Sequence, residues 1–144
     1  MDTRIALVTG GGSGIGREIC LGLARDGRKV AVADINLPGA QETQAAVLEA
    51  GGVAVAVQMD VSDTDAVHDG LLEVIDDFGP VEVLVNCAGW DELKPFGSTD
   101  ESFWDRVIEI NYKGVLRTVH TLSLIHISEP TRPRLISYAV FCLK

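Results

Sequence analysis

The 144-residue sequence lacks the features of secreted, membrane-spanning and nucleic-acid-binding proteins. Its three cysteines, Cys20, Cys87 and Cys142, are widely spaced and odd in number, which fits a reducing compartment and matches no zinc-ligand pattern. No stretch approaches the ~20 apolar residues of a membrane span, and the first four residues lack the layout of a signal peptide. Basic residues are scarce, since 12 Lys and Arg face 21 Asp and Glu and leave a net charge of -9. We therefore expect a cytoplasmic protein with no nucleic-acid or membrane partner and no bound metal.

The sequence does contain a regular alternation of strand-like and helix-like segments. Short apolar runs rich in β-branched residues, typical of parallel strands buried on both faces, cover residues 5–8, 30–33, 53–57 and 81–85. Between them, apolar residues at helical spacing predict helices over 15–25, 38–50 and 63–78. Residues 98–101 (STDE) have the pattern of a capping box, with Ser98 opening a fourth helix. This alternation predicts an α/β fold of the Rossmann type, a doubly wound parallel sheet with strand order 3-2-1-4.

The first predicted strand ends in a glycine-rich run, residues 9–16 (TGGGSGIG). Glycines allow a tight turn and let the backbone approach a pyrophosphate without a Cβ in the way. The helix that follows presents free N–H groups and a positive dipole end to such an anion. A plain glycine-rich turn is the alternative. Because the run follows a strand and opens a helix, we favour a dinucleotide-binding loop.

Asp34 stands at the end of the second predicted strand. A carboxylate there accepts hydrogen bonds from the ribose hydroxyls of NAD and repels the 2′-phosphate of NADP. The loop has no Lys or Arg before Gly14, and none follows Asp34 directly. We therefore expect NAD as the cofactor. The alternative is a solvated carboxylate at a strand end.

Four motifs, in order and at matching spacing, resemble those of the classical short-chain dehydrogenases/reductases. They are residues 9–16 (TGGGSGIG), 60–61 (DV), 86–89 (NCAG, with Cys87 in place of the family's second Asn) and 111–114 (NYKG). The resemblance runs from about residue 4 to Thr121. It implies an NAD-dependent oxidoreductase that interconverts a secondary alcohol and a ketone. It also implies a small-molecule substrate and a homotetrameric parent protein.

The resemblance implies roles for individual residues as well. The cofactor's pyrophosphate would lie against the loop formed by Gly10, Gly12, Ser13, Gly14, Ile15 and Gly16. Asp60 and Val61 would contact adenine, whereas Asn86, Ala88 and Gly89 would line the nicotinamide ribose and steady the central sheet. Asn111 would be catalytic and hold a water in the proton relay. Asn is a poor helix former, so its mid-helix position also predicts a specific partner rather than solvent.

A narrower resemblance concerns the segment after the third motif. Residues 88–91 (AGWD) and 94–96 (KPF) resemble a segment of 2-hydroxycyclohexanecarboxyl-CoA dehydrogenases and related hydroxyacyl-CoA enzymes. This implies a hydroxyacyl-CoA substrate. The alternative is a 3-oxoacyl thioester on a carrier protein. Trp90 would either wall the substrate ring or be a loop aromatic that pins Pro95 and Phe96.

The acid–base residues of the family are missing from the sequence. The resemblance implies a Ser and a Tyr-x-x-x-Lys, but Leu116 lies four residues after Tyr112 and Cys142 lies four after Tyr138. From Leu122 the helical pattern breaks, and residues 122–144 resemble the translation of a sequencing-library adapter. We therefore expect residues 1–121 to be the N-terminal part of a Rossmann domain, truncated after its fourth strand and following helix. The chain itself would be a non-catalytic NAD-binding fragment, and its fourth strand would lack an outer neighbour.

Overall fold

A computed structural model describes residues 4–128 and 139–141 of the chain. Strands and helices alternate through its first half: β1 (Ile5–Thr9), α1 (Gly14–Arg25), β2 (Lys29–Asp34), α2 (Leu37–Glu49), β3 (Val53–Gln58), α3 (Thr64–Phe78) and β4 (Val81–Asn86). A 3-10 turn, η1 (Phe96–Ser98), precedes a long helical segment made of α4 (Glu101–Ile108), the π turn η2 (Glu109–Lys113) and α5 (Gly114–Ser128). A short strand, β5 (Ala139–Phe141), comes last.

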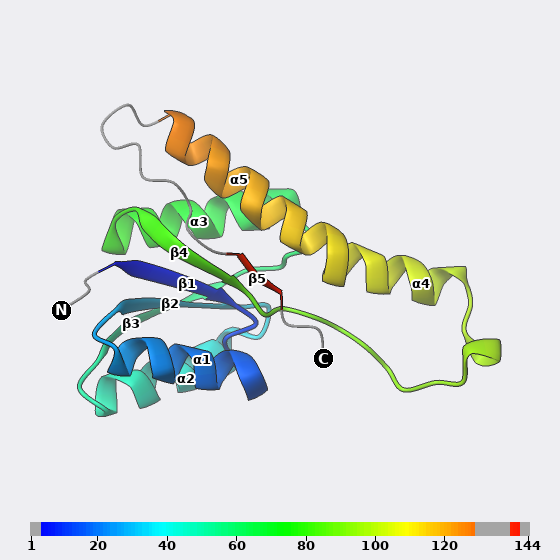
Figure 1. Cartoon of the computed structure of the whole chain (residues 1–144), viewed down its shortest axis with the longest axis horizontal. Coiled ribbons are helices and arrows are strands. Elements are labelled where there is room, and N and C mark those ends of the chain that lie inside the picture. The colour runs from blue at the N-terminus through cyan, green and yellow to red at the C-terminus, as the bar shows by residue number, and fades with distance from the viewer. Residues whose placement is uncertain (1–3, 129–138, 142–144) are drawn as a thin grey trace.

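The strands form one parallel sheet in the order β3-β2-β1-β4-β5. The predicted order 3-2-1-4 and the doubly wound fold are therefore confirmed. Helices α1 and α2 cover one face of the sheet, and α3 and α5 cover the other (Figure 1). Neighbouring strand residues point to opposite faces. Leu7 accordingly belongs to the core under α3 and α5, and Val8 belongs to the core under α1 and α2.

The predicted helices agree with the observed ones to within a residue, except at the start of the fourth. Asp100, not Ser98, caps α4, because its carboxylate accepts a hydrogen bond from the Phe103 N–H at 3.0 Å. The Ser98 hydroxyl instead donates to the Pro95 carbonyl in the preceding turn. Hydrogen bonds from the Ser102 hydroxyl and from the Phe103 N–H lower the pKa of Asp100. Because the Ser98 hydroxyl is bound within the preceding turn, the cap position falls to Asp100, whose ionised carboxylate is a strong acceptor.

Two expectations about the last segment are wrong. The helical pattern does not break at Leu122, because α5 continues to Ser128 and the Leu122 side chain is fully buried in the core under α3. Leu122 lies four residues after the buried Thr118, so it falls on the same helix face. Strand β4 does have an outer neighbour, since Leu84, Val85 and Asn86 pair with β5 in parallel register. The sheet thus has a fifth strand beyond the four that the sequence pattern predicted.

Within residues 4–128 and 139–141, no helix combines the length and the apolar character that crossing a membrane requires.

Candidate cofactor-binding site

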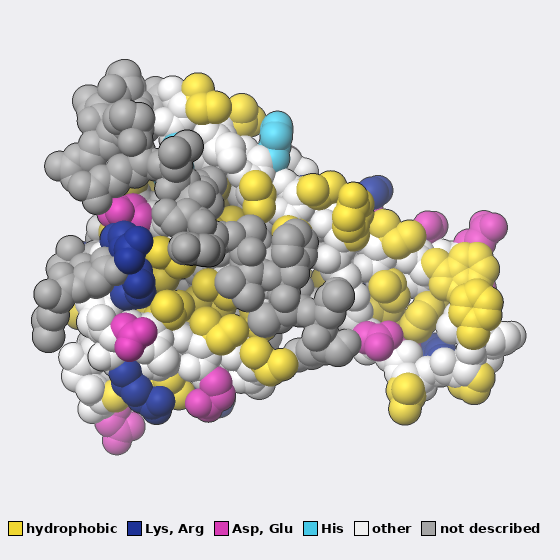
Figure 2. All heavy atoms as spheres, viewed as in Figure 1, with side chains coloured by type: hydrophobic (Ala, Val, Ile, Leu, Met, Phe, Trp, Pro, Cys, Tyr) yellow, Lys and Arg dark blue, Asp and Glu magenta, His cyan; other side chains and the backbone are white. Residues whose placement is uncertain are grey.

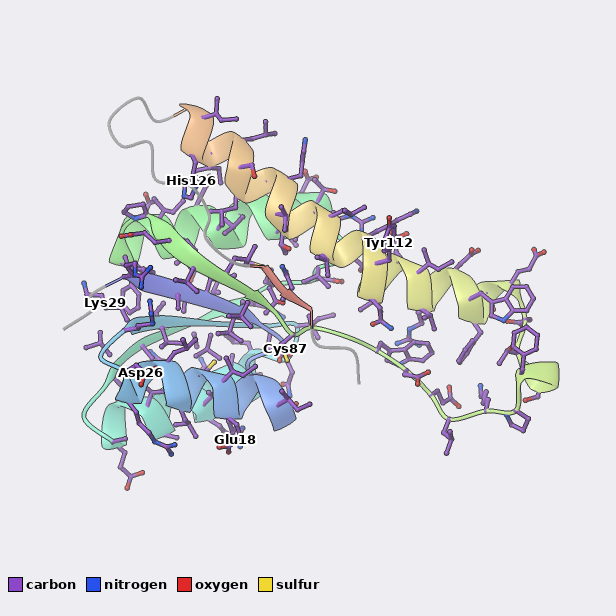
Figure 3. The ribbon with its side chains drawn as sticks, in the orientation of Figure 1. Glu18, Asp26, Lys29, Cys87, Tyr112 and His126 are labelled. Carbon is purple, nitrogen blue, oxygen red and sulfur yellow. The ribbon has the colours of Figure 1, made fainter. Side chains whose placement is uncertain are left out.

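A cleft of about 240 Å³ opens at the carboxyl ends of the strands. It lies where the strand order reverses between β1 and β4, which is the usual ligand site of a doubly wound sheet. Cys87, labelled in Figure 3, directly follows β4 and marks this edge of the sheet. The residues that line the cleft are Gly10, Ser13, Asp34, Ile35, Met59, Asp60, Val61, Cys87, Ala88, Gly89, Trp90, Arg106 and Ile110.

The glycine-rich loop packs so closely that two of its positions exclude any side chain. Gly10 has a φ of +67°, and a Cβ there would lie 2.7 Å from the backbone of Ala88. A Cβ on Gly16 would lie 2.0 Å from the Gly10 carbonyl oxygen. The first turn of α1 can therefore sit directly on the loop only because both residues are glycine.

The first turn of α1 is open to an anion. Ser13 is its N-cap and makes no capping hydrogen bond with its side chain, and the turn carries no acidic residue. Gly14 begins the helix with a φ of +50°, and Ile15 is half exposed at its start. The unpaired N–H groups and the positive end of the helix dipole suit the diphosphate of a dinucleotide.

Asp34 is fixed at the lip of the cleft by two backbone N–H groups. Its Oδ2 accepts from Gly12 at 2.9 Å, and its Oδ1 accepts from Asn36 at 2.9 Å. A Cβ on Gly12 would lie 2.8 Å from Oδ2, so the loop can approach this carboxylate only as glycine. Each carboxylate oxygen has a second acceptor site, so the group can still bind hydroxyl donors.

Asp60 and Val61 line the cleft at the end of β3. The Asp60 Oδ1 accepts from the Ser62 N–H at 2.8 Å and from the Ser62 hydroxyl at 2.6 Å. These bonds turn the chain sharply after Met59. The buried Val61 side chain and the buried Met59 side chain therefore form an apolar part of the wall that a flat ring could contact.

The ends of β1 and β4 are joined beneath the cleft. The Thr9 hydroxyl oxygen accepts from the N–H groups of Cys87 and Ala88, both at 3.2 Å. Asn86 is buried behind the cleft, where its Oδ1 accepts from the Thr118 hydroxyl at 2.6 Å. No described residue pairs with the Nδ2 of Asn86. Asn86 thus ties β4 to α5 and does not line the cleft.

Asn111 lies in the π turn η2 and binds the backbone of Trp90 at both ends of its amide. Its Oδ1 accepts from the Trp90 N–H at 2.7 Å, and its Nδ2 donates to the Trp90 carbonyl at 2.8 Å. A Cβ on Gly89 would lie 3.2 Å from the Asn111 Oδ1, so Gly89 permits this close contact. The prediction of a specific partner for Asn111 is confirmed.

Trp90 forms part of the wall beside Asn111. The guanidinium of Arg106 stacks over its indole at 3.9 Å from the ring centroid, and Phe103 packs against the ring at 5.4 Å. Phe96 instead stacks on Trp104 at 5.8 Å. The predicted alternative, in which Trp90 pins Phe96, is therefore wrong, because the aromatic partner of Trp90 is Phe103.

The structure brings seven predicted site residues together around the cleft: Gly10, Ser13, Asp34, Asp60, Val61, Ala88 and Gly89. The other six, Gly12, Gly14, Ile15, Gly16, Asn86 and Asn111, shape the loop, the helix start and the walls from behind. Sequence reasoning missed the apolar neighbours Ile35, Met59 and Ile110, each adjacent in the chain to a predicted site residue, and adjacency could have found them. Arg106 gave no local signal.

The chain is similar to known proteins over most of its length. A sequence model of the short chain dehydrogenase family matches residues 4–131. The chain belongs to the short-chain dehydrogenase family. It is 43% identical over 121 residues to 3-oxoacyl-(acyl-carrier-protein) reductase FabG of Staphylococcus aureus, covering 81% of this chain and 48% of the relative. It is 37% identical over 116 residues to sorbitol dehydrogenase of Cereibacter sphaeroides, covering 81% of this chain and 44% of the relative. The chain thus spans about half the length of these two relatives.

Solved structures of this family superpose well on the chain. A 3-ketoacyl-ACP reductase from Sinorhizobium meliloti 1021 gives a TM-score of 0.79 at 32% identity, covering 86% of this chain and 49% of that one. An actinorhodin polyketide ketoreductase solved with NADPH gives a TM-score of 0.80 at 34% identity, covering 84% and 46%. The four-motif resemblance found in the sequence is therefore confirmed as family membership.

The described part of this short-chain dehydrogenase holds no cluster of three His, Cys, Asp or Glu side chains that could bind a metal. Tyr112 is 63% exposed and points away from the body of the molecule (Figure 3). Tyr138 and Ser137 lie outside the described residues.

Proposed function

We propose that the parent protein is an NAD-dependent oxidoreductase that interconverts a secondary alcohol and a ketone. The observation that carries the proposal is the placement of Asp34 at the lip of the cleft, opposite an uncapped helix start. A bound nicotinamide dinucleotide would supply hydride transfer. The chain's own residues would hold its phosphates at Gly10, Gly12, Ser13, Gly14, Ile15 and Gly16, its ribose at Asp34, and its adenine at Asp60 and Val61. Towards the nicotinamide, Ala88 and Gly89 would line the wall, with Asn86 bracing the sheet behind them.

The direct test of this site is a titration of the purified 144-residue chain with NADH, followed by the fluorescence of the reduced dinucleotide. Saturable binding that is lost in Gly16→Ala, but kept in Gly22→Ala, is the expected result. Gly22 is a matched control, because a Cβ there meets no atom within 4 Å. Binding that is unchanged in Gly16→Ala would reject the loop as the phosphate site.

The substrate that we propose is a hydroxyacyl-CoA. Support comes from the resemblance of residues 88–91 and 94–96 to hydroxyacyl-CoA enzymes, and from the Arg106 guanidinium held over Trp90 beside the cleft. A 3-oxoacyl thioester on a carrier protein is the second candidate, favoured by the 43% identity to a protein named 3-oxoacyl-(acyl-carrier-protein) reductase. Assay of the intact parent with both thioesters and NADH separates them, because only one should give saturable turnover.

For the 144-residue chain itself we propose cofactor binding without turnover. Asn111 would position a water, but its amide has no proton that titrates near pH 7. General acid–base catalysis contributes about 10²–10⁴-fold, and in the family it needs a Tyr paired with a Lys. Tyr112 does not meet this need, because it is exposed and is followed four residues later by Leu116. Ketone-dependent NADH oxidation that disappears in Asn111→Ala would reject this proposal.

We also propose that residues 122–144 are a translated sequencing adapter rather than natural sequence. The support is the resemblance of that stretch to adapter codons. Resequencing the gene across codon 121 tests the proposal. A continuation that encodes a Ser and a Tyr-x-x-x-Lys supports both the artefact and the enzyme. An unchanged reading frame that ends after codon 144 would reject both.

The parent is proposed to be a cytoplasmic homotetramer. The support within this chain is the exposure of three apolar side chains on the long helical segment, Ile108, Tyr112 and Leu116. In Figure 2, hydrophobic side chains gather along this segment and over η1. Sedimentation of the intact parent as a monomer would reject the tetramer.

A further inference from the structure

Arg117 contacts the backbone of two segments that are far apart in the sequence. Its side chain is 19% exposed and reaches back from α5 to two backbone carbonyls. Its Nη1 donates to the Glu109 carbonyl at 3.2 Å and to the Val61 carbonyl at 3.3 Å. Its Nη2 pairs with the Glu109 Oε1. One guanidinium therefore contacts the start of the π turn and the loop that carries Asp60 and Val61.

The Glu109 carbonyl belongs to the π turn that contains Asn111. In this turn the carbonyl accepts from the Gly114 N–H, five residues on, rather than from the residue four on. A π turn adds one residue to the helix and so rotates the residues before it by roughly 100° relative to those after it. Without the turn, the Asn111 side chain and the buried face of α5 could not both keep their present directions.

Glu109 holds the same turn through its side chain. Its Oε2 pairs with the Lys113 ammonium at 2.9 Å, while its Oε1 pairs with Arg117. The hydrogen bonds from Lys113 and Arg117 lower the pKa of Glu109. Only Arg117 also reaches the backbone, so the two cations differ in what they fix.

The Val61 loop is pressed against the same helix. A Cβ on Gly114 would lie 2.8 Å from the Val61 Cγ2, so α5 approaches this loop as closely as a glycine allows. The Val61 carbonyl then accepts from Arg117. The proposed adenine wall and the turn that carries Asn111 therefore share one packed contact, about Gly114 and Arg117.

We propose that Arg117 is a positioning residue that holds the π turn and thereby orients the Asn111 side chain toward the Trp90 backbone. Through the same contacts, Arg117 couples the orientation of Asn111 to the loop of Asp60 and Val61. The coupling to a bound dinucleotide rests on the proposed function. The orientation of Asn111 does not rest on the proposed function, because it is a property of the chain without a ligand. Arg117 is not proposed to touch substrate or cofactor.

The experiment uses the 144-residue chain labelled with [15N]asparagine, whose three asparagines are Asn36, Asn86 and Asn111. The Asn111 side-chain NH₂ signal, identified by its absence in Asn111→Ala, reports the bond to the Trp90 carbonyl. The variants are Arg117→Met, Arg117→Lys and the matched control Lys113→Gln, which removes a cation from Glu109 but touches neither carbonyl. NADH dissociation constants are measured for each.

We expect Arg117→Met to move the Asn111 signal toward that of a solvated amide while the Asn36 signal stays in place. Lys113→Gln should leave both signals unchanged. The NADH dissociation constant should rise roughly fivefold in Arg117→Met, at the low end of typical coupling between linked sites, and less in Arg117→Lys, which can still donate to a carbonyl.

An Asn111 signal unchanged in a folded Arg117→Met chain would overturn the proposal. So would the loss of all three signals together in both Arg117 variants, because Arg117 would then support the fold in general. If no variant and no wild-type chain binds NADH, the dinucleotide site fails, and the Asn111 signal alone decides the positioning role.

Discussion

Replacing Asp34 with asparagine should change which dinucleotide the chain prefers. The carboxylate is held by the N–H groups of Gly12 and Asn36, so an amide of the same shape can keep one of these bonds while losing the charge. Two unit charges 4 Å apart repel by about 1 kcal/mol in water and about 4 kcal/mol at an effective dielectric of 20. Since a factor of ten corresponds to about 1.4 kcal/mol, we expect the wild-type chain to bind NADH at least about fivefold more tightly than NADPH.

In Asp34→Asn the two affinities should converge from both sides. The affinity for NADPH should rise, because the repulsion between the carboxylate and the 2′-phosphate is gone. NADH loses about 1 kcal/mol, because hydrogen bonds to a charged acceptor contribute more than those to a neutral one. Asp26→Asn is the matched control. Asp26 follows the last residue of α1, at the end of the helix away from the cleft (Figure 3), so this substitution removes the same charge without touching the cleft.

The assay is a fluorescence titration of each chain with NADH and NADPH at two salt concentrations. Added salt should narrow the wild-type gap, because the Debye length falls from about 10 Å at 0.1 M to about 3 Å at 1 M. Equal affinities in the wild-type chain would refute the reasoning about Asp34. If Asp26→Asn and Asp34→Asn reduce the difference between NADH and NADPH affinity equally, net charge sets the preference, and not the position of the Asp34 carboxylate.

Three further changes test the packing. Gly16→Ala should lower the free energy of unfolding by several kcal/mol, because its Cβ would meet the Gly10 oxygen at 2.0 Å, whereas Gly22→Ala should raise it by about 0.5–1 kcal/mol in urea titrations. Leu122→Ala should lower the free energy of unfolding by about 2–5 kcal/mol in the same assay. Leu124→Ala, at a 51% exposed site, should lower it by less than about 0.5 kcal/mol, and equal losses in the two variants would contradict the course of α5. Burial, and to a lesser degree the nearby Cys87, raises the pKa of Cys20 to about 12, so the folded chain keeps the thiol proton to a higher pH than the unfolded chain does. The free energy of unfolding should therefore fall as the pH rises from 9 to 12, and it should depend less on pH in Cys20→Ala.

Much of the fold could be predicted because the core positions carry a strong local signal. Runs of Val and Ala are typical of parallel strands covered on both faces, and a Gly lies within two residues after the observed end of each of α1, α2 and α3. The capping of α4 was mispredicted because Ser98 and Asp100 both fit a cap pattern, and the choice depends on the turn that precedes the helix. The course of α5 past Leu122 depends on burial against α3, which a local reading of residues 122–128 does not contain.

In the candidate site, too, the residues with local constraints could be predicted, whereas the contacts that depend on long-range packing could not. Gly10, Gly16 and Asp34 were predictable because each is constrained by a backbone that lies close in the motif or at the next strand end. The contact between Asn111 and Trp90 joins residues 21 positions apart, and it needs a π turn that no propensity scale foretells. Only the demand of Asn111 for a partner could be read locally; the identity of the partner comes from the packing.

The contacts of the cleft also bear on how binding and chemistry are divided in this family member. Every described residue proposed to bind the dinucleotide lies between Gly10 and Gly89, at the ends of β1 to β4. Asn111 is already held in place by Trp90, Gly89 and the π turn, without any contribution from an acid–base residue. A side chain fixed in advance in this way loses no order when further residues pack around it, so the geometry of Asn111 should be the same in the 144-residue chain and in the proposed intact parent. The Asn111 side-chain signal should accordingly match between the two proteins, and a clear difference would mean that the second half of the parent, and not Arg117 and Trp90, sets its position.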